Sequence, residues 1–160
     1  MPSLRHLLWP LLACLPLESL TAQPLPSPGG HPIEYALDDC MEQGEWQPSV
    51  MRECAATAES RWQDEVAQLT ARLAQVLGRE AREALEASDD AWQRALDADL
   101  ALIDAYHAQL VEAELGDPAL LPLARQLHRN AVLEERALRL RRFLDGLEAL
   151  EMPAEAPSAP

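Results

Sequence analysis

The sequence predicts an all-α protein, an elongated antiparallel helical hairpin with a third long helix laid against it as a three-helix bundle. Three observations lead to this prediction. Ala, Leu, Glu and Arg dominate the 160 residues, while aromatic residues make up only 4% and Gly occurs 6 times, a composition that favours helices. Apolar residues recur at steps of three and four, which places them on one face of a helix. Short segments containing Gly or Pro divide this pattern into separate helices.

Residues 1–22 have the features of a secretory signal peptide. A basic start at Arg5 is followed by an apolar run, and small or polar residues lead to a plausible cleavage site after Ala22. The apolar run is too short to span a bilayer. Two alternatives stay open, lipidation at Cys14 within a lipoprotein-like box and a cytosolic protein with a frayed N-terminus. We expect a periplasmic or secreted protein, with a lipoprotein at Cys14 as the lesser possibility.

Removal of the leader leaves two cysteines, Cys40 and Cys54. An even pair in an oxidising compartment predicts a disulfide, whose loop closure would contribute about 3 kcal/mol in the chain-entropy model. We expect no metal site at this pair, because no second Cys or His lies at ligand spacing. No cofactor is expected either.

Residues 23–47 read as a Pro- and Gly-rich tether, a short helix from Ile33 to Glu42 that Gly44 stops, and the loop held by the disulfide. Residues 48–151 form the helical domain, and Pro48 suits the first turn of its first helix. The apolar stripe of that helix comprises Met51, Cys54, Ala55, Ala58, Trp62, Val66, Leu69, Leu73, Val76 and Leu77.

Gly78 is placed where the first long helix would end, although one helix running straight through it as a coiled-coil rod is the chief alternative. The second stripe comprises Leu85, Ala91, Trp92, Leu96, Leu100, Ile103, Tyr106 and Leu110.

The sequence Gly116-Asp117-Pro118 predicts a stop, with Asp117 as the cap of the next helix and Pro118 at its start. The spacing of the third stripe stutters around residues 131–138, so its face is expected to rotate there. That stripe comprises Leu121, Ala124, Leu127, Ala131, Leu138, Leu140, Leu144 and Leu147. Residues 152–160 have nothing to bury and are expected to be a disordered tail.

The charge balance limits the partners. Thirteen Arg and no Lys stand against 27 Asp and Glu, a net charge of -14. This argues against nucleic acid, which needs a basic footprint, and against an anionic membrane surface. A basic protein is favoured as partner, and another envelope protein is the alternative.

The candidate partner contacts lie in the short helix and the disulfide loop, where a held loop loses less entropy on docking. They are Asp38, Asp39, Glu42, Glu45 and Trp46. No catalytic residue is expected, because Ser49, Ser60 and Ser88 lack a glycine elbow and no His-Glu-x-x-His pattern occurs. The run of Arg136, Arg139, Arg141 and Arg142 predicts ion pairs along a helix face.

Four segments resemble the lysozyme inhibitor LprI-like N-terminal domain family, which consists of small exported all-helical domains. They are Asp39-Cys40, Met51-Arg-Glu-Cys54-Ala55, residues 73–85, and the run from Ala91-Trp92 to Asp97-Ala-Asp99. Glu135-Arg136-Ala-Leu-Arg-Leu140 is similar to the family's last element. The resemblance marks Trp92 and Asp97 as signature residues. From its place on an apolar stripe Trp92 is expected to pack between helices, and Asp97 is expected either to pair with an Arg of a neighbouring helix or to cap structure within the hairpin.

This chain departs from the family pattern at its second cysteine pair. Leu100 stands where one Cys is expected, and no Cys lies near Asn130, which together fit the loss of a whole disulfide. The resemblance implies binding to a basic lysozyme, and it leaves a structural or adaptor bundle of the cell envelope as the alternative. The sequence therefore predicts an exported, non-enzymatic protein-binding domain.

Overall fold

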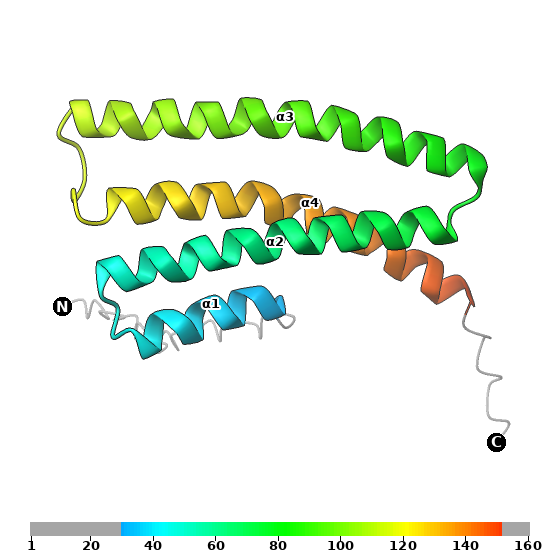
Figure 1. Ribbon diagram of the computed structural model, residues 1–160, viewed down its shortest axis with the longest axis horizontal. Helices are drawn as coiled ribbons and strands as arrows, with labels where there is room; N and C mark the ends of the chain where they lie inside the picture. The colour runs from blue at the N-terminus through cyan, green and yellow to red at the C-terminus, as the bar shows by residue number, and fades with distance from the viewer. Residues whose placement is uncertain (1–29, 152–160) are drawn as a thin grey trace, which may run out of the picture.

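The computed structural model describes residues 30–151 and shows an all-helical bundle of four helices. They are α1 (Pro32–Gln43), α2 (Pro48–Val76), α3 (Arg79–Glu112) and α4 (Leu121–Glu151). The helix α4 lies between α3 and α2 over its first half, and α1 runs beside the N-terminal half of α2 (Figure 1). The predicted signal peptide, Cys14, most of the tether and the predicted tail lie outside the described residues.

The first two helices begin where local chemistry favours a helix start. His31 caps α1, its Nδ1 accepting from the backbone N of Ile33 at 3.3 Å, while the side chain of Glu34 accepts from the backbone N of His31 at 2.7 Å. Pro48 opens α2 at its first position, as predicted. The short helix thus forms where the sequence predicts it, one residue longer at each end.

The chain turns at Leu77 and Gly78, so the coiled-coil rod does not form. Both residues have extended backbone, with ψ of 142° and 169°. Gly78 caps the start of α3 and does not close α2 with a left-handed residue, which corrects the predicted role. Leu77 is half-buried and packs against the core, so the turn itself adds apolar contact.

The second connection contains Gly116, whose φ of +86° lies in the left-handed region that favours glycine. Asp117 Oδ1 accepts from the backbone N of Ala119 at 2.9 Å. Asp117 therefore caps a single turn, and α4 starts at Leu121, later than the predicted start at Pro118.

The main core lies between α2 and α4. The first eight members of the predicted α2 stripe are buried, from Met51 to Leu73, whereas Val76 is exposed. On α4 the prediction was partly wrong, because Leu127, Ala131 and Leu138 are exposed. The buried seam of α4 comprises Leu123, Asn130, Leu133, Arg136, Ala137, Leu140 and Leu144.

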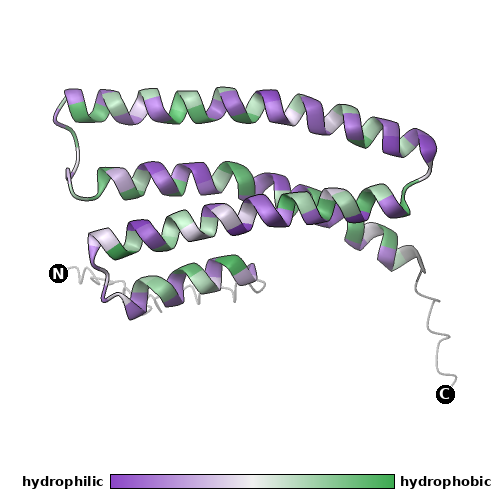
Figure 2. Ribbon diagram, in the orientation of Figure 1, coloured by the Kyte–Doolittle hydropathy of each residue, from purple (hydrophilic) through white to green (hydrophobic). Residues whose placement is uncertain are grey.

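Polar residues, Asn130 and Arg136, occupy two positions of that seam. A search for regularly spaced apolar residues therefore does not identify which face of α4 is buried. Each helix in Figure 2 carries apolar and polar residues side by side, as expected for helices with one covered face. No helix between residues 30 and 151 is both long enough and apolar enough to cross a bilayer.

Candidate functional site

The five predicted partner contacts lie at one end of the molecule, where α1 ends and α2 begins. Cys40 of α1 is bonded to Cys54 of α2, with their Cα atoms 5.9 Å apart, which confirms the predicted disulfide. The bond fixes the C-terminal turn of α1 against the second turn of α2. The loop between these helices is therefore held at both ends.

The loop backbone is held by its own hydrogen bonds. Glu45 and Trp46 have φ of 50° and 57°, a left-handed conformation that is uncommon for residues other than glycine. The backbone N of Trp46 donates to Met41 O at 3.0 Å, and that of Glu45 donates to Glu42 O at 2.9 Å. A Cβ at position 44 would collide with the side chain of Val50, so the close approach of the two helices requires Gly44. The loop is accordingly a defined element of the fold.

Trp46 presents its indole to solvent from this loop, with 56% of the residue exposed. Asp38, Asp39, Glu42 and Glu45 are exposed as well. The last turn of α1 holds no basic residue, so its carboxylates face the negative end of the helix dipole, which is unfavourable. Local stability therefore does not explain this acidic grouping, which we call the acidic end.

The two signature residues have different surroundings on α3. Trp92 is half-buried against the core, and the guanidinium of Arg136 lies 5.2 Å from its ring centroid. Asp97 is exposed and forms no ion pair within residues 30–151, so the predicted pairing with an Arg is not made. The face of α3 toward α4 passes through Trp92, Leu96 and Leu100, and Asp97 lies about 100° away from Leu96 around the helix.

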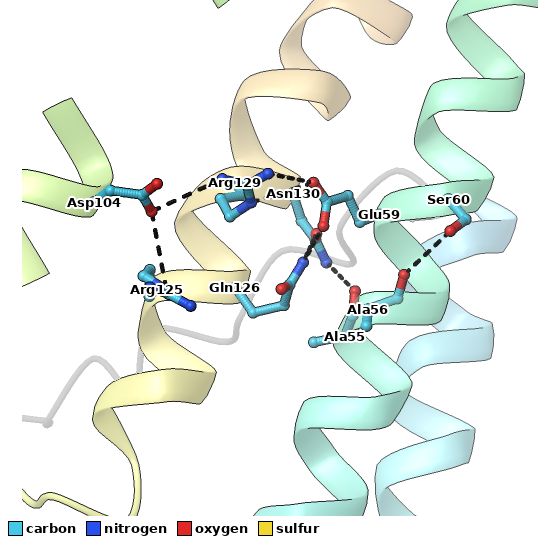
Figure 3. A network of polar contacts seen from close by, with 9 residues as sticks. All are labelled: Ala55, Ala56, Glu59, Ser60, Asp104, Arg125, Gln126, Arg129 and Asn130. Carbon is cyan, nitrogen blue, oxygen red and sulfur yellow. Dashed lines mark hydrogen bonds and ion pairs between the residues drawn. The ribbon is translucent and has the colours of Figure 1, made fainter. Parts of the chain in front are cut away.

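Polar contacts between the long helices form a second feature (Figure 3). The buried side chain of Asn130 donates to the backbone O of Ala55 at 2.9 Å. Glu59 of α2 accepts from Gln126 Nε2 at 2.5 Å and from Arg129 Nε at 3.2 Å. These bonds supply partners to polar groups in the α2–α4 seam, so we assign them a role in holding the two helices together.

The other side of α4 carries ionic and imidazole contacts to α3. Asp104 Oδ1 lies 3.9 Å from Arg125 Nε and 3.8 Å from Arg129 Nη1. His107 Nε2 and His128 Nδ1 are 3.0 Å apart, and His107 is only 5% exposed. Burial lowers the pKa of His107, the neighbouring His128 and Arg125 lower it further, and Asp104 opposes them.

Neither polar grouping follows from the sequence alone, because its members are far apart in the chain and meet only when the helices pair. His107 and His128 are separated by 21 positions, and Glu59 and Arg129 by 70. The arginine run does form ion pairs, but only Arg139 pairs along its own helix, with Glu135. Arg136 pairs with Asp89 of α3, and Arg141 with Glu65 of α2.

Two hollows open beside α3. One, of about 750 Å³, lies between the C-terminal end of α3 and the start of α4 and includes Asp104, Glu114 and Arg125. The other, of about 420 Å³, lies between the C-terminal end of α2, the N-terminal part of α3 and the second half of α4. Within residues 30–151, His, Cys, Asp and Glu side chains do not gather in threes as metal ligands would.

Comparison of the chain with protein-family models, with curated proteins and with solved structures finds no match, so its function has to be inferred from its own residues.

Proposed function

We propose that this protein is an exported, non-enzymatic binding domain whose acidic end covers part of the surface of a basic partner. A lysozyme-like enzyme is the most specific form of that partner, in keeping with the LprI-like resemblance. The observation that carries the proposal is the exposed indole of Trp46, held in a disulfide-anchored loop and accompanied by exposed carboxylates. Buried aromatic anchors dominate the energetics of many protein interfaces.

The electrostatics of the chain support the same kind of partner. A net charge of -14 would attract a basic protein over long distances and speed its association, with a rate that falls as salt is added. Charge alone provides little specificity, so the acidic end supplies the contact geometry. The hydrogen-bonded loop loses little conformational entropy on docking, which favours affinity.

The disulfide supports the proposed export. Such bonds persist in oxidising compartments and are rare where thiols are kept reduced. The bond between Cys40 and Cys54 therefore fits a periplasmic or secreted protein.

Inhibition of a C-type lysozyme tests the proposal directly. The purified protein is mixed with the enzyme at low salt, and lysis of peptidoglycan is followed over time. We expect inhibition that weakens as salt is added, because part of the attraction is screened. An unchanged lysis rate at about a hundredfold molar excess of the protein would show that lysozyme is not the partner.

Two variants of equal charge locate the contact. The first neutralises the acidic end as D38N, D39N, E42Q and E45Q. The matched control neutralises four exposed carboxylates of α3 as E80Q, E86Q, D90N and D97N. We expect at least about a tenfold loss of affinity in the first variant and in Trp46→Ala, and much less in the control. Equal losses in both charge variants would mean that net charge alone acts.

An adaptor role in the cell envelope is the second candidate, because several large apolar side chains stay exposed. Leu102, Val111 and Phe143 are 68%, 62% and 60% exposed. Apolar association persists at high salt, whereas binding by the acidic end does not. Sedimentation in about 1 M salt separates the two candidates, since complexes that survive there favour the adaptor role.

A further inference from the structure

The smaller hollow is an apolar groove with arginines at one end, and we call it the arginine groove. It has a volume of about 420 Å³, within the range of small-molecule sites. Ser88, Arg136 and Arg139 contribute its polar groups. Its large apolar side chains come from three helices and the turn between α2 and α3, and are Leu73, Leu77, Leu85, Leu140, Phe143 and Leu147.

The polar and apolar parts of the groove are separated along its length. The side chain of Arg136 donates to Ser88 Oγ at 3.2 Å, which places both at the same end. Leu77, at the turn between α2 and α3, and Leu147, near the end of α4, mark the other end. Leu147 follows Arg136 by eleven positions of the same helix, a length of about 16 Å. The groove is thus a long apolar channel with a cationic end.

The charged side chains that line this groove are basic, unlike most charged residues of the chain. Its lining includes two arginines and no Asp or Glu, in a chain with 27 acidic and 13 basic residues. Arg136 is 4% exposed and donates to Ser88 and to Asp89, while its buried Nε has no hydrogen-bond partner among the described residues. Arg139 is half-exposed and pairs with Glu135. A buried guanidinium with an unused donor retains capacity for an anionic acceptor.

We propose that the arginine groove binds the free monomer of a long-chain carboxylic acid, with the alkyl chain along the leucines and the carboxylate at Arg136 and Arg139. Burial of the chain supplies most of the affinity, and the arginines select the anion. The groove lies between α2, α3 and α4, whereas the acidic end lies where α1 meets α2. This binding is therefore separate from the proposed contact with a basic protein.

The larger hollow provides an internal comparison. It also has apolar walls, including Leu110, Val111 and Leu121, and one arginine, Arg125. However, its lining includes the carboxylates of Asp104 and Glu114, which repel an anionic head group. An alkyl carboxylate should therefore prefer the arginine groove.

The binding test titrates the protein with laurate below its micellar concentration, using calorimetry and tryptophan fluorescence. Trp92 is a suitable reporter because its ring lies 5.2 Å from the Arg136 guanidinium. We expect one bound laurate per chain and at least about tenfold weaker binding of dodecanol, which lacks the charge. Dodecyltrimethylammonium should not compete with laurate. Absence of laurate binding, or equal binding of the alcohol, overturns the proposal.

Substitutions in the two hollows test where laurate binds. Ala84→Phe fills the arginine groove from an exposed position of α3, and Ala108→Phe does the same in the larger hollow. We expect at least about a tenfold loss of laurate affinity in the first and an unchanged affinity in the second. Arg139→Gln, at a half-exposed position, should weaken laurate binding and leave dodecanol binding unchanged. A loss in Ala108→Phe alone would assign the ligand to the other hollow and overturn the proposal.

Discussion

The two faces of α4 are covered to different extents. Toward α2 the seam is closed, and eight residues of α2 are buried, Trp62, Leu69 and Leu73 among them. Toward α3 the seam is only partly closed, and His107 is the sole buried residue of α3. The apolar stripe of α3 does face α4, but residues such as Trp92 and Leu96 stay half-exposed.

This difference shows that apolar stripes of similar length need not yield similar packing. The α2–α4 seam combines large aliphatic side chains with a hydrogen-bonded Asn130. The α3–α4 seam depends more on polar contacts, through His107, Asp104 and the pair of Arg136 with Asp89. Partly exposed ion pairs contribute little net stability, so α3 should be the least stable long helix.

Removing a leucine from each seam should give the largest contrast. Leu69→Ala should lower the free energy of unfolding by about 2–5 kcal/mol, because it leaves a cavity in the closed seam. Leu96→Ala, at a half-buried position of α3, should lower it by about 1 kcal/mol, because less surface is lost. Urea unfolding followed by circular dichroism measures both values. Equal losses would contradict the proposed difference between the seams.

Asn130 should matter more to stability than its partly buried neighbour Gln126 in the same seam. Asn130→Ala removes the bond to Ala55 O inside the core and should cost about 1–3 kcal/mol in urea unfolding. Gln126→Ala is the matched control, since Arg129 continues to bond Glu59, and it should cost less than about 1 kcal/mol. A cost for Asn130→Ala below that of the control would mean that the buried amide is dispensable.

Acid should loosen α3 before the rest of the bundle. The pKa of His107 is below its usual value of 6.5, so its stabilising contribution is complete above pH 6.5 and is lost as the pH falls below that value. Protonation places a charge beside His128 and Arg125, with only Asp104 to compensate.

Hydrogen exchange, corrected for intrinsic rates, should then show faster exchange around His107 than in the middle of α2 between pH 7 and 5. The variant His107→Gln should abolish this acid response. Uniform protection of both helices at the two pH values would count against a weaker α3.

The contact between Glu134 of α4 and Glu34 of α1 should respond to acid in the reverse direction. Burial raises the pKa of Glu134, and the neighbouring carboxylate of Glu34 and a hydrogen bond to it raise it further. Its contribution is therefore complete below pH 4.5 and is lost as the pH rises through the raised value. Glu134→Gln should slightly increase the free energy of unfolding at pH 7 and have little effect at pH 4. Asp145→Asn, at an exposed position of α4 that forms no ion pair within the described residues, controls for net charge.

The sequence alone was sufficient for the elements whose causes are local. The buried face of α2 as far as Leu73, the short helix ended at Gly44, the start at Pro48 and the disulfide were all predicted correctly. Each depends on residues a few positions apart or, for the disulfide, on an even cysteine count. The acidic end and Trp46 also belong to this group, because these five residues lie within nine positions of one another.

Only the tertiary structure determined the features that form between two or more helices. The seam of α4 could not be predicted from apolar spacing, because Asn130 and Arg136 become buried only through acceptors on α2 and α3. The histidine pair, the incomplete cover on α3 and the arginine groove likewise arise between helices that are distant in the chain. Helix periodicity reports which residues share a face, whereas the partner of that face is set by the packing of the whole bundle.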